Sequence, residues 1–213
     1  MTVLLLVRHG QSEMNINKCF TGQLDVDLSE MGTKQAQMLA DWAVENYKID
    51  AIYSSDLLRA YHTAEPSAKR LGLQIKTSDA LREIFAGQWQ GMSFTQIKEK
   101  YPAEHDVWMH DCGNAVCPGG ESVQHLAERV ITKIRQIAQE NDGKTVMIAT
   151  HATPIRVFEA VLRKGDISLT QQIPFVPNTS TTVCCYENGI FEFRTVGFDG
   201  YLEGCTSSLP SNI

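Results

Sequence analysis

Several features that would place this chain in a specialised class are missing from its 213 residues. No segment is apolar over the roughly 20 residues that a membrane-spanning helix needs. The short apolar run at residues 1–7 has no basic stretch before it and no small-residue cleavage pattern after it, so a secretory signal is not expected. Neither an internal repeat nor an interdomain linker interrupts the chain. We therefore expect a single domain over residues 1–213, located in the cytoplasm.

An excess of basic charge is also missing. The chain has 25 acidic and 19 basic residues, which give a formal net charge of −6. This balance offers no electrostatic support for binding nucleic acid or an anionic membrane, so neither partner is expected. Any anion that the protein binds must be held by a local cluster of positive groups. With 43% hydrophobic and 21% charged residues, the composition is otherwise that of an ordinary globular protein.

The cysteine pattern lacks the spacings that mark a metal site or a redox motif. None of the six cysteines forms a Cys-x-x-Cys pair. In a cytoplasmic protein they are expected to be reduced, and several to be buried. A zinc site on Cys112 and Cys117 is a weak alternative, because the usual ligand spacings are absent. No metal and no other cofactor is expected.

Apolar runs alternate with helical patterns along the chain, which predicts an α/β fold. Asn188-Gly189 is a strong signal for the turn of a β-hairpin. The predicted strands cover residues 4–7, 51–53, 73–77, 146–149, 181–186 and 190–196. The predicted helices cover residues 30–47, the stretch between Ser55 and Gly72, residues 122–141, and a segment after His151. Residues 88–120 show no clear period, and we expect a small irregular lid there; a small packed subdomain is at least as good an interpretation.

Two of the predicted strands end in a histidine. The apolar run at residues 4–7 is followed by Arg8, His9 and Gly10, and the run at residues 146–149 leads to His151. In open α/β sheets, ligands bind at the carboxyl ends of the strands. A guanidinium suits phosphate geometry, and a neutral imidazole is a competent nucleophile toward phosphorus. Taken alone, however, Arg-His-Gly is equally well explained as a chance tripeptide in a loop.

An arginine is expected near the start of the second predicted helix. If Ser55 caps this helix, Arg59 falls in the first turn, where free backbone N–H groups and the helix dipole favour an anion. The alternative is a surface arginine beside Asp56.

Glu83 stands next to the apolar residues Ile84 and Phe85. A carboxyl group that is partly desolvated by such neighbours suits general acid catalysis. A rim charge paired with Arg82 is the alternative.

Several separated motifs resemble those of the histidine phosphatase superfamily, also called the phosphoglycerate mutase-like family. The opening signature RHGQSEMN occupies residues 8–15. The further motifs, in the order that the family shows, are FTGQ at 20–23, DVDLSEMG at 25–32, SSDLLRA at 54–60, REIFAGQWQG at 82–91, PGGES at 118–122, and His151. The resemblance spans nearly the whole chain. It implies a three-layer sandwich with a mostly parallel central sheet flanked by helices.

The resemblance also implies a role for each candidate residue. His9 is the nucleophile that takes the phosphoryl group, and Glu83 is the proton donor to the leaving alcohol. The groups that surround the phosphoryl oxygens are Arg8, Arg59 and His151. The other substrate contacts are Asn15, Thr21, Gly22 and Ala152. We further expect a backbone carbonyl to fix the tautomer of His9.

The expected activity is that of a metal-independent phosphomonoesterase acting on a small phosphorylated metabolite, as a monomer or homodimer. A 2,3-bisphosphoglycerate-dependent phosphoglycerate mutase is the alternative, but mutases of this family carry a longer insertion than residues 91–118. A non-catalytic binding protein is a third possibility, which the presence of both a nucleophile and an acid opposes. Three departures from the family pattern, Cys19, His62 and Ala152, put the substrate preference in doubt.

Overall fold

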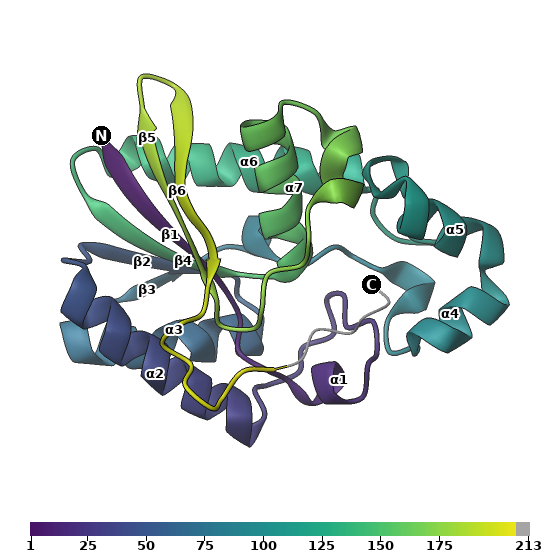
Figure 1. Cartoon of the computed structure of the whole chain (residues 1–213), viewed down its shortest axis with the longest axis horizontal. Coiled ribbons are helices and arrows are strands. Elements are labelled where there is room, and N and C mark those ends of the chain that lie inside the picture. Colours follow the sequence, from purple (N-terminus) through teal and green to yellow (C-terminus); the bar gives the residue numbers. More distant parts are fainter. Residues whose placement is uncertain (208–213) are drawn as a thin grey trace.

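A six-stranded sheet forms the centre of the protein, whose structure is a computed structural model that describes residues 1–207. The strand order is β3-β2-β4-β1-β5-β6. The strands β1 (Thr2–Arg8), β2 (Ala51–Ser54), β3 (Ile75–Thr77) and β4 (Thr145–Thr150) run parallel. The hairpin of β5 (Thr181–Glu187) and β6 (Ile190–Phe198) adds an antiparallel edge beside β1. The mostly parallel sheet is therefore confirmed (Figure 1).

The central strands contain long apolar runs because helices cover both of their faces. Successive side chains of a strand point to opposite faces. Leu4 and Leu6 of β1 accordingly belong to one hydrophobic core, while Leu5 and Val7 belong to a second core on the other face. All four of these side chains are fully buried. A continuous apolar run is what a strand buried on both faces requires.

Two pairs of long helices complete the three layers. On one face, α2 (Glu30–Asn46) and α3 (Leu58–Leu71) pack around Leu5 and Val7. On the other face, α6 (Val123–Glu140) and α7 (Ala152–Lys164) pack around Leu4 and Leu6. Figure 1 shows the two pairs on opposite sides of the sheet. Within residues 1–207, no helix has the length and apolar character needed to cross a membrane.

The region around residues 88–120 is more regular than expected. It contains the short helices α4 (Phe94–Lys100) and α5 (Pro102–His110), which project to one side of the sheet (Figure 1). Ser93 and Gln96 form a reciprocal capping box at the start of α4, and Pro102 occupies the first position of α5. Both are ordinary helix-start signals. The sequence pattern did not reveal these helices, because each is too short to show a clear apolar period.

The start of α3 also differs from the prediction. Ser55 does not cap the helix; Leu57 is the residue before its first turn and makes no capping hydrogen bond through its side chain. The predicted place of Arg59 in the first turn is nevertheless confirmed. The Ser55 hydroxyl oxygen instead lies 2.9 Å from Nε2 of His151. The same oxygen accepts from the backbone N–H of Leu57 at 3.3 Å, so Ser55 joins the chain before α3 to the residue that follows the neighbouring strand β4.

Shorter elements connect these layers. A single helical turn, α1 (Glu13–Ile16), follows β1, and Ser12 and Asn15 form its capping box. Four 3₁₀ turns occur at Asp79–Leu81, Gly87–Trp89, Cys112–Asn114 and Ile167–Gln172. The hairpin turn at Asn188 and Gly189 has positive φ at both residues, 51° and 86°, as its sequence predicted.

Close backbone packing holds the loop after β1 against the start of α2. A Cβ atom added to Gly32 would lie 2.0 Å from the carbonyl oxygen of Gln11, and one added to Gly10 would lie 2.8 Å from the carbonyl oxygen of Gly32. Neither position has room for a side chain without movement of the backbone.

Replacement of Gly32 by alanine should therefore destabilise the protein. We expect the free energy of unfolding to fall by about 1–3 kcal/mol, the usual cost of overpacking. Urea unfolding measures this change, with Lys34→Ala at an exposed position of the same helix as the control. Equal stability of the two variants would show that the Gly32 contact is not constraining.

Candidate active site

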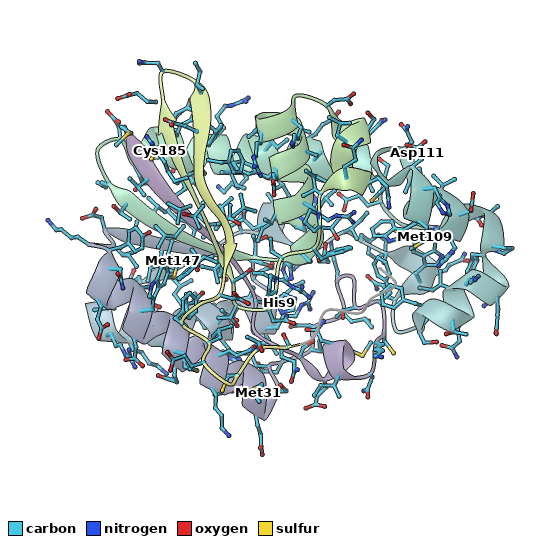
Figure 2. The ribbon with its side chains drawn as sticks, viewed as in Figure 1. His9, Met31, Met109, Asp111, Met147 and Cys185 are labelled. Atoms are coloured by element: carbon cyan, nitrogen blue, oxygen red, sulfur yellow. The ribbon has the colours of Figure 1, made fainter. Side chains whose placement is uncertain are left out.

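A pocket of about 380 Å³ lies where the carboxyl end of β1 meets the start of α7. Figure 2 shows His9 just beyond the end of the strand, in the middle of the molecule. The predicted site residues that line the pocket are Arg8, His9, Asn15, Thr21, Gly22, Arg59, Glu83 and Ala152. His151, the remaining predicted residue, is buried beside the ring of His9. The structure therefore brings together all of the residues that the motifs single out.

The pairing of β1 with β4 brings the two histidines together. Arg8 is in register with Thr150, and the backbone N–H of His9 donates to the carbonyl of Thr150 at 2.9 Å. The residues that follow these two strands are therefore His9 and His151. Their ring centroids lie 5.1 Å apart. The side chain of His151 is completely buried, and its Nδ1 has no hydrogen-bond partner among the described residues.

The tautomer of His9 is fixed by its own neighbour. Nδ1 lies 2.7 Å from the carbonyl oxygen of Gly10, which can only accept, so Nδ1 carries the proton. Nε2 is consequently left with its lone pair. The expected backbone carbonyl acceptor is therefore present, and it leaves the imidazole in the form that a nucleophile needs.

Two buried arginines supply the positive charge of the pocket. Nη1 of Arg8 donates to the carbonyl of Val176 at 2.6 Å, and Arg59 donates to the carbonyls of Leu24 and Gly22, both at 2.8 Å. The Nε atoms of both arginines have no partner within residues 1–207. Arg59 is fully buried, which rules out the surface arginine considered as the alternative.

Burial disfavours the charged form of both arginines, and the charge of Glu83 offsets only part of this effect. Burial lowers the pKa of Arg8 and of Arg59 to about 10, while the charge of Glu83 acts in the opposite direction on both. Each guanidinium therefore remains protonated at neutral pH, held by neutral carbonyl groups. Positive charge that is only partly compensated in this way favours an anionic ligand.

Burial also keeps both imidazoles neutral. The pKa of His9 and that of His151 are held well below their ordinary value, chiefly because burial disfavours the charged form. The charge of Arg59 and that of Arg8 lower both pKa values further. A neutral His9 beside two cations is the state in which its Nε2 lone pair can attack an electrophile.

Glu83 presents a nearly buried carboxyl group at the edge of the pocket. Its Oε1 accepts from the backbone N–H of Ile84 at 2.9 Å, and its Oε2 accepts from the N–H of Thr153, in the first turn of α7, at 3.4 Å. Arg82 pairs with Asp56 instead, with Nε 2.7 Å from Oδ1. The alternative of a Glu83–Arg82 rim pair was therefore wrong.

Asn178 is a site residue that the sequence analysis missed. Its Nδ2 donates to the carbonyl of His9 at 3.0 Å and to Oδ1 of Asn15 at 3.2 Å. Oδ1 of Asn15 also accepts from the backbone N–H of Ser12. With Oδ1 of Asn15 engaged in these bonds, Nδ2 of Asn15 is left to donate to a ligand. No motif marks Asn178, since its place depends on the antiparallel return of the chain into β5. An asparagine between Pro177 and Thr179, just before a strand, was the only signal available.

The chain after Asp199 returns to the site. Gln35 of α2 donates to the carbonyl of Cys205 at 2.7 Å, and the hydroxyl of Ser207 donates to Oδ1 of Asn178 at 2.9 Å. Ser207 also lines the pocket. The remainder of the tail, residues 208–213, lies outside the described residues.

The chain resembles known proteins over most of its length. Residues 4–199 match the model of the histidine phosphatase superfamily (branch 1). Phosphoserine phosphatase 1 of Hydrogenobacter thermophilus is 36% identical over 168 residues, 79% of each chain. A 2,3-bisphosphoglycerate-dependent phosphoglycerate mutase of Cytophaga hutchinsonii is 33% identical over 168 residues, 77% of this chain and 78% of the mutase. The solved structure of YhfR from Bacillus stearothermophilus is 26% identical, with a TM-score of 0.90 over 95% of this chain and 100% of that one.

The two buried imidazoles should make stability depend on pH. In the unfolded chain they take up protons below about pH 6.5, whereas the folded state resists protonation until a much lower pH. The free energy of unfolding should therefore be highest above about pH 7 and fall on acidification, by about 1.4 kcal/mol per pH unit for each histidine. Urea unfolding at a series of pH values measures the slope.

Two variants test whether the buried histidines cause this slope. His151→Asn should reduce the slope by about 1.4 kcal/mol per pH unit, because one histidine fewer takes up a proton on unfolding. Lys34→Ala, at an exposed position of α2 that carries no histidine, should leave it unchanged. Identical slopes for the wild type and His151→Asn would contradict the assignment.

Proposed function

The chain belongs to the histidine phosphatase superfamily, and from that premise we propose that it is a metal-independent phosphomonoesterase that works through a phosphohistidine on His9. The observation that carries this proposal is the unprotonated Nε2 of His9 in a pocket that also holds Arg8, Arg59 and Glu83. A nucleophile, cations for the transferred group and an acid for the leaving group are the parts that phosphoryl transfer requires.

The first step transfers the phosphoryl group to the enzyme. The lone pair of His9 Nε2 forms the N–P bond while the ester P–O bond breaks, and Glu83 in its protonated form gives its proton to the departing oxygen. Arg8, Arg59 and His151 surround the three equatorial oxygens, over which the charge is spread. Because both guanidinium groups are already fixed by backbone carbonyls, little reorganisation is needed as the charge develops.

The second step returns the enzyme to its starting state. The carboxylate of Glu83 accepts a proton from a water molecule, whose oxygen attacks phosphorus as the N–P bond breaks. Inorganic phosphate leaves, the electron pair returns to Nε2, and Glu83 is protonated again for the next cycle. One carboxyl group therefore serves both half-reactions.

The proposed substrate is a small phosphorylated metabolite. The pocket volume of about 380 Å³ lies in the range of small-molecule sites. The six free cysteines support a reducing compartment, and hence the proposed cytoplasmic location.

The mutase is the second candidate, because one relative carries that name. A mutase must keep water away from its phosphohistidine until the second hydroxyl is in place. Here the cover consists of the two short helices α4 and α5. A short cover excludes water less completely than a long insertion, so it favours hydrolysis of the phosphohistidine over transfer of the phosphoryl group to a second hydroxyl.

Hydrolysis of 4-nitrophenyl phosphate in the presence of a chelator tests the proposal. We expect turnover that the chelator does not reduce, and a loss of about three orders of magnitude or more in kcat for His9→Ala, because the nucleophile is removed. A phosphoryl group trapped by quenching without acid should be found on His9 by mass spectrometry.

The other outcomes each identify a different function. Activity only with phosphoglycerate and its bisphosphate would favour the mutase. Phosphate binding without any turnover would favour a non-catalytic protein. Label on a serine or cysteine would overturn the mechanism.

A further inference from the structure

Several apolar and aromatic side chains line the pocket beside its polar ones. Phe94 comes from α4 and Trp108 from α5, so the two lid helices supply one wall. Phe20 and Phe175 come from loops that follow β1 and precede β5. The remaining apolar lining residues are Met14, Ile16, Ala152 and Gly22.

The aromatic walls are held in place by contacts outside the pocket. The ring of Phe20 lies 5.2 Å from that of Trp108 and 5.8 Å from that of Phe94, measured between centroids. Phe175 stacks on the guanidinium of Arg156, 4.1 Å from its ring centroid, and Nε of this buried arginine donates to the carbonyl of Ile173 at 2.6 Å. An apolar surface fixed in this way binds a ligand without the cost of ordering its own side chains.

Charged groups are scarce in the lining of the pocket. Among the described lining residues, Lys18 is the single cation besides Arg8 and Arg59, and Glu83 is the single carboxylate. Lys18 is exposed, so it gains little from pairing with an anion. An ammonium group on the substrate would find no carboxylate other than the proposed acid, and a second anionic group would find one exposed lysine.

From this lining we propose that the enzyme prefers phosphate monoesters of apolar alcohols, above all those that carry an aromatic ring, over esters of charged alcohols. The inference rests on the proposed phosphatase function. In this binding mode the phosphoryl group contacts the arginines, and the alcohol lies against Phe94, Trp108 and Phe175. Burial of a ring that ethyl phosphate lacks should raise kcat/KM by about tenfold to a hundredfold.

A pair of substrates with the same reacting centre tests this preference. Ethyl phosphate and 2-phenylethyl phosphate both release a primary alkanol, so their kcat/KM ratio reports on the ring alone. We expect the ratio to favour 2-phenylethyl phosphate by at least about tenfold, and O-phosphoserine to be no better than ethyl phosphate. Phe94→Ala and Phe175→Ala should both lower the ratio, whereas Tyr47→Ala, an aromatic outside the pocket, should leave it unchanged.

The outcomes separate this inference from the proposed function. A ratio near one, or a preference for O-phosphoserine, with turnover that still requires His9 would overturn the inference and leave the phosphatase intact. Absence of turnover with every ester, while inorganic phosphate still binds, would overturn the phosphatase itself.

An independent set of contacts concerns the placement of Glu83. Arg129 of α6 lies outside the pocket, yet its Nη1 donates to the carbonyls of Ala80 and Arg82, at 3.0 and 2.8 Å. Its Nη2 donates to the carbonyl of Glu83 at 2.8 Å. Nε and Nη2 also pair with the two carboxylate oxygens of Glu121, at 2.7 and 2.9 Å.

Glu121 holds the other side of the same segment. Its backbone N–H donates to the carbonyl of Phe85 at 2.7 Å, and its Oε2 accepts from the N–H of Phe85 at 3.1 Å. The backbone is thus fixed both before and after Glu83. We infer that Arg129 and Glu121 are positioning residues, which set the carboxyl group of Glu83 for proton transfer to the leaving alcohol.

The leaving group distinguishes positioning from a merely structural role. Arg129→Lys keeps the charge but loses the fork of donors. We expect kcat/KM to fall about tenfold more for 2-phenylethyl phosphate than for 4-nitrophenyl phosphate, because nitrophenolate leaves without a proton. Arg163→Lys is the matched control, since Arg163 pairs with the equally buried Glu159 at the far end of α7.

Equal losses on both esters for Arg129→Lys would overturn the positioning role. Glu83→Gln serves as the reference for the acid itself. If this variant also lost activity equally on both esters, the general acid step of the proposed function would be wrong.

Discussion

The backbone hydrogen bonds between β1 and β4 place the two strand ends side by side, and the chemistry of the pocket depends on that register. Val7 lies opposite Ala149 and Arg8 opposite Thr150, so His9 and His151 follow at the same level of the sheet. A slip of one residue would turn the side chains to the opposite faces. The two hydrophobic cores, which require Leu4 and Leu5 on opposite faces, thereby also fix the distance between the imidazoles.

The pocket concentrates groups that burial destabilises. Arg8 and Arg59 are held by carbonyl groups in place of carboxylates, and both imidazoles are kept neutral. The charge of Glu83 offsets only part of the cost of burying the two guanidinium groups, and the large apolar cores must offset the rest. A carboxylate partner for either arginine would stabilise the empty protein, but it would compete with a phosphoryl group for the same donors. Function and stability therefore act against each other here.

The sequence predicted the parts of the site that short motifs and strand ends determine. His9, His151 and the first-turn position of Arg59 follow from apolar runs and one helix start. The contacts of Asn178 and of Arg129 were not predictable, because each joins segments that are far apart in the chain and no local pattern marks them. The helices α4 and α5 were missed for another reason. They bury few side chains, so their capping signals had no periodic pattern to support them.

The strand order also has a consequence for synthesis of the chain. The apolar strand β1 is the first to be made, yet both of its neighbours, β4 and β5, are encoded more than a hundred residues later. Until the ribosome has produced them, the backbone edges of β1 have no partner, and an unpaired apolar edge readily joins other chains. Protection of this strand by a chaperone or by transient local collapse is therefore a requirement that the sheet topology places on the cell.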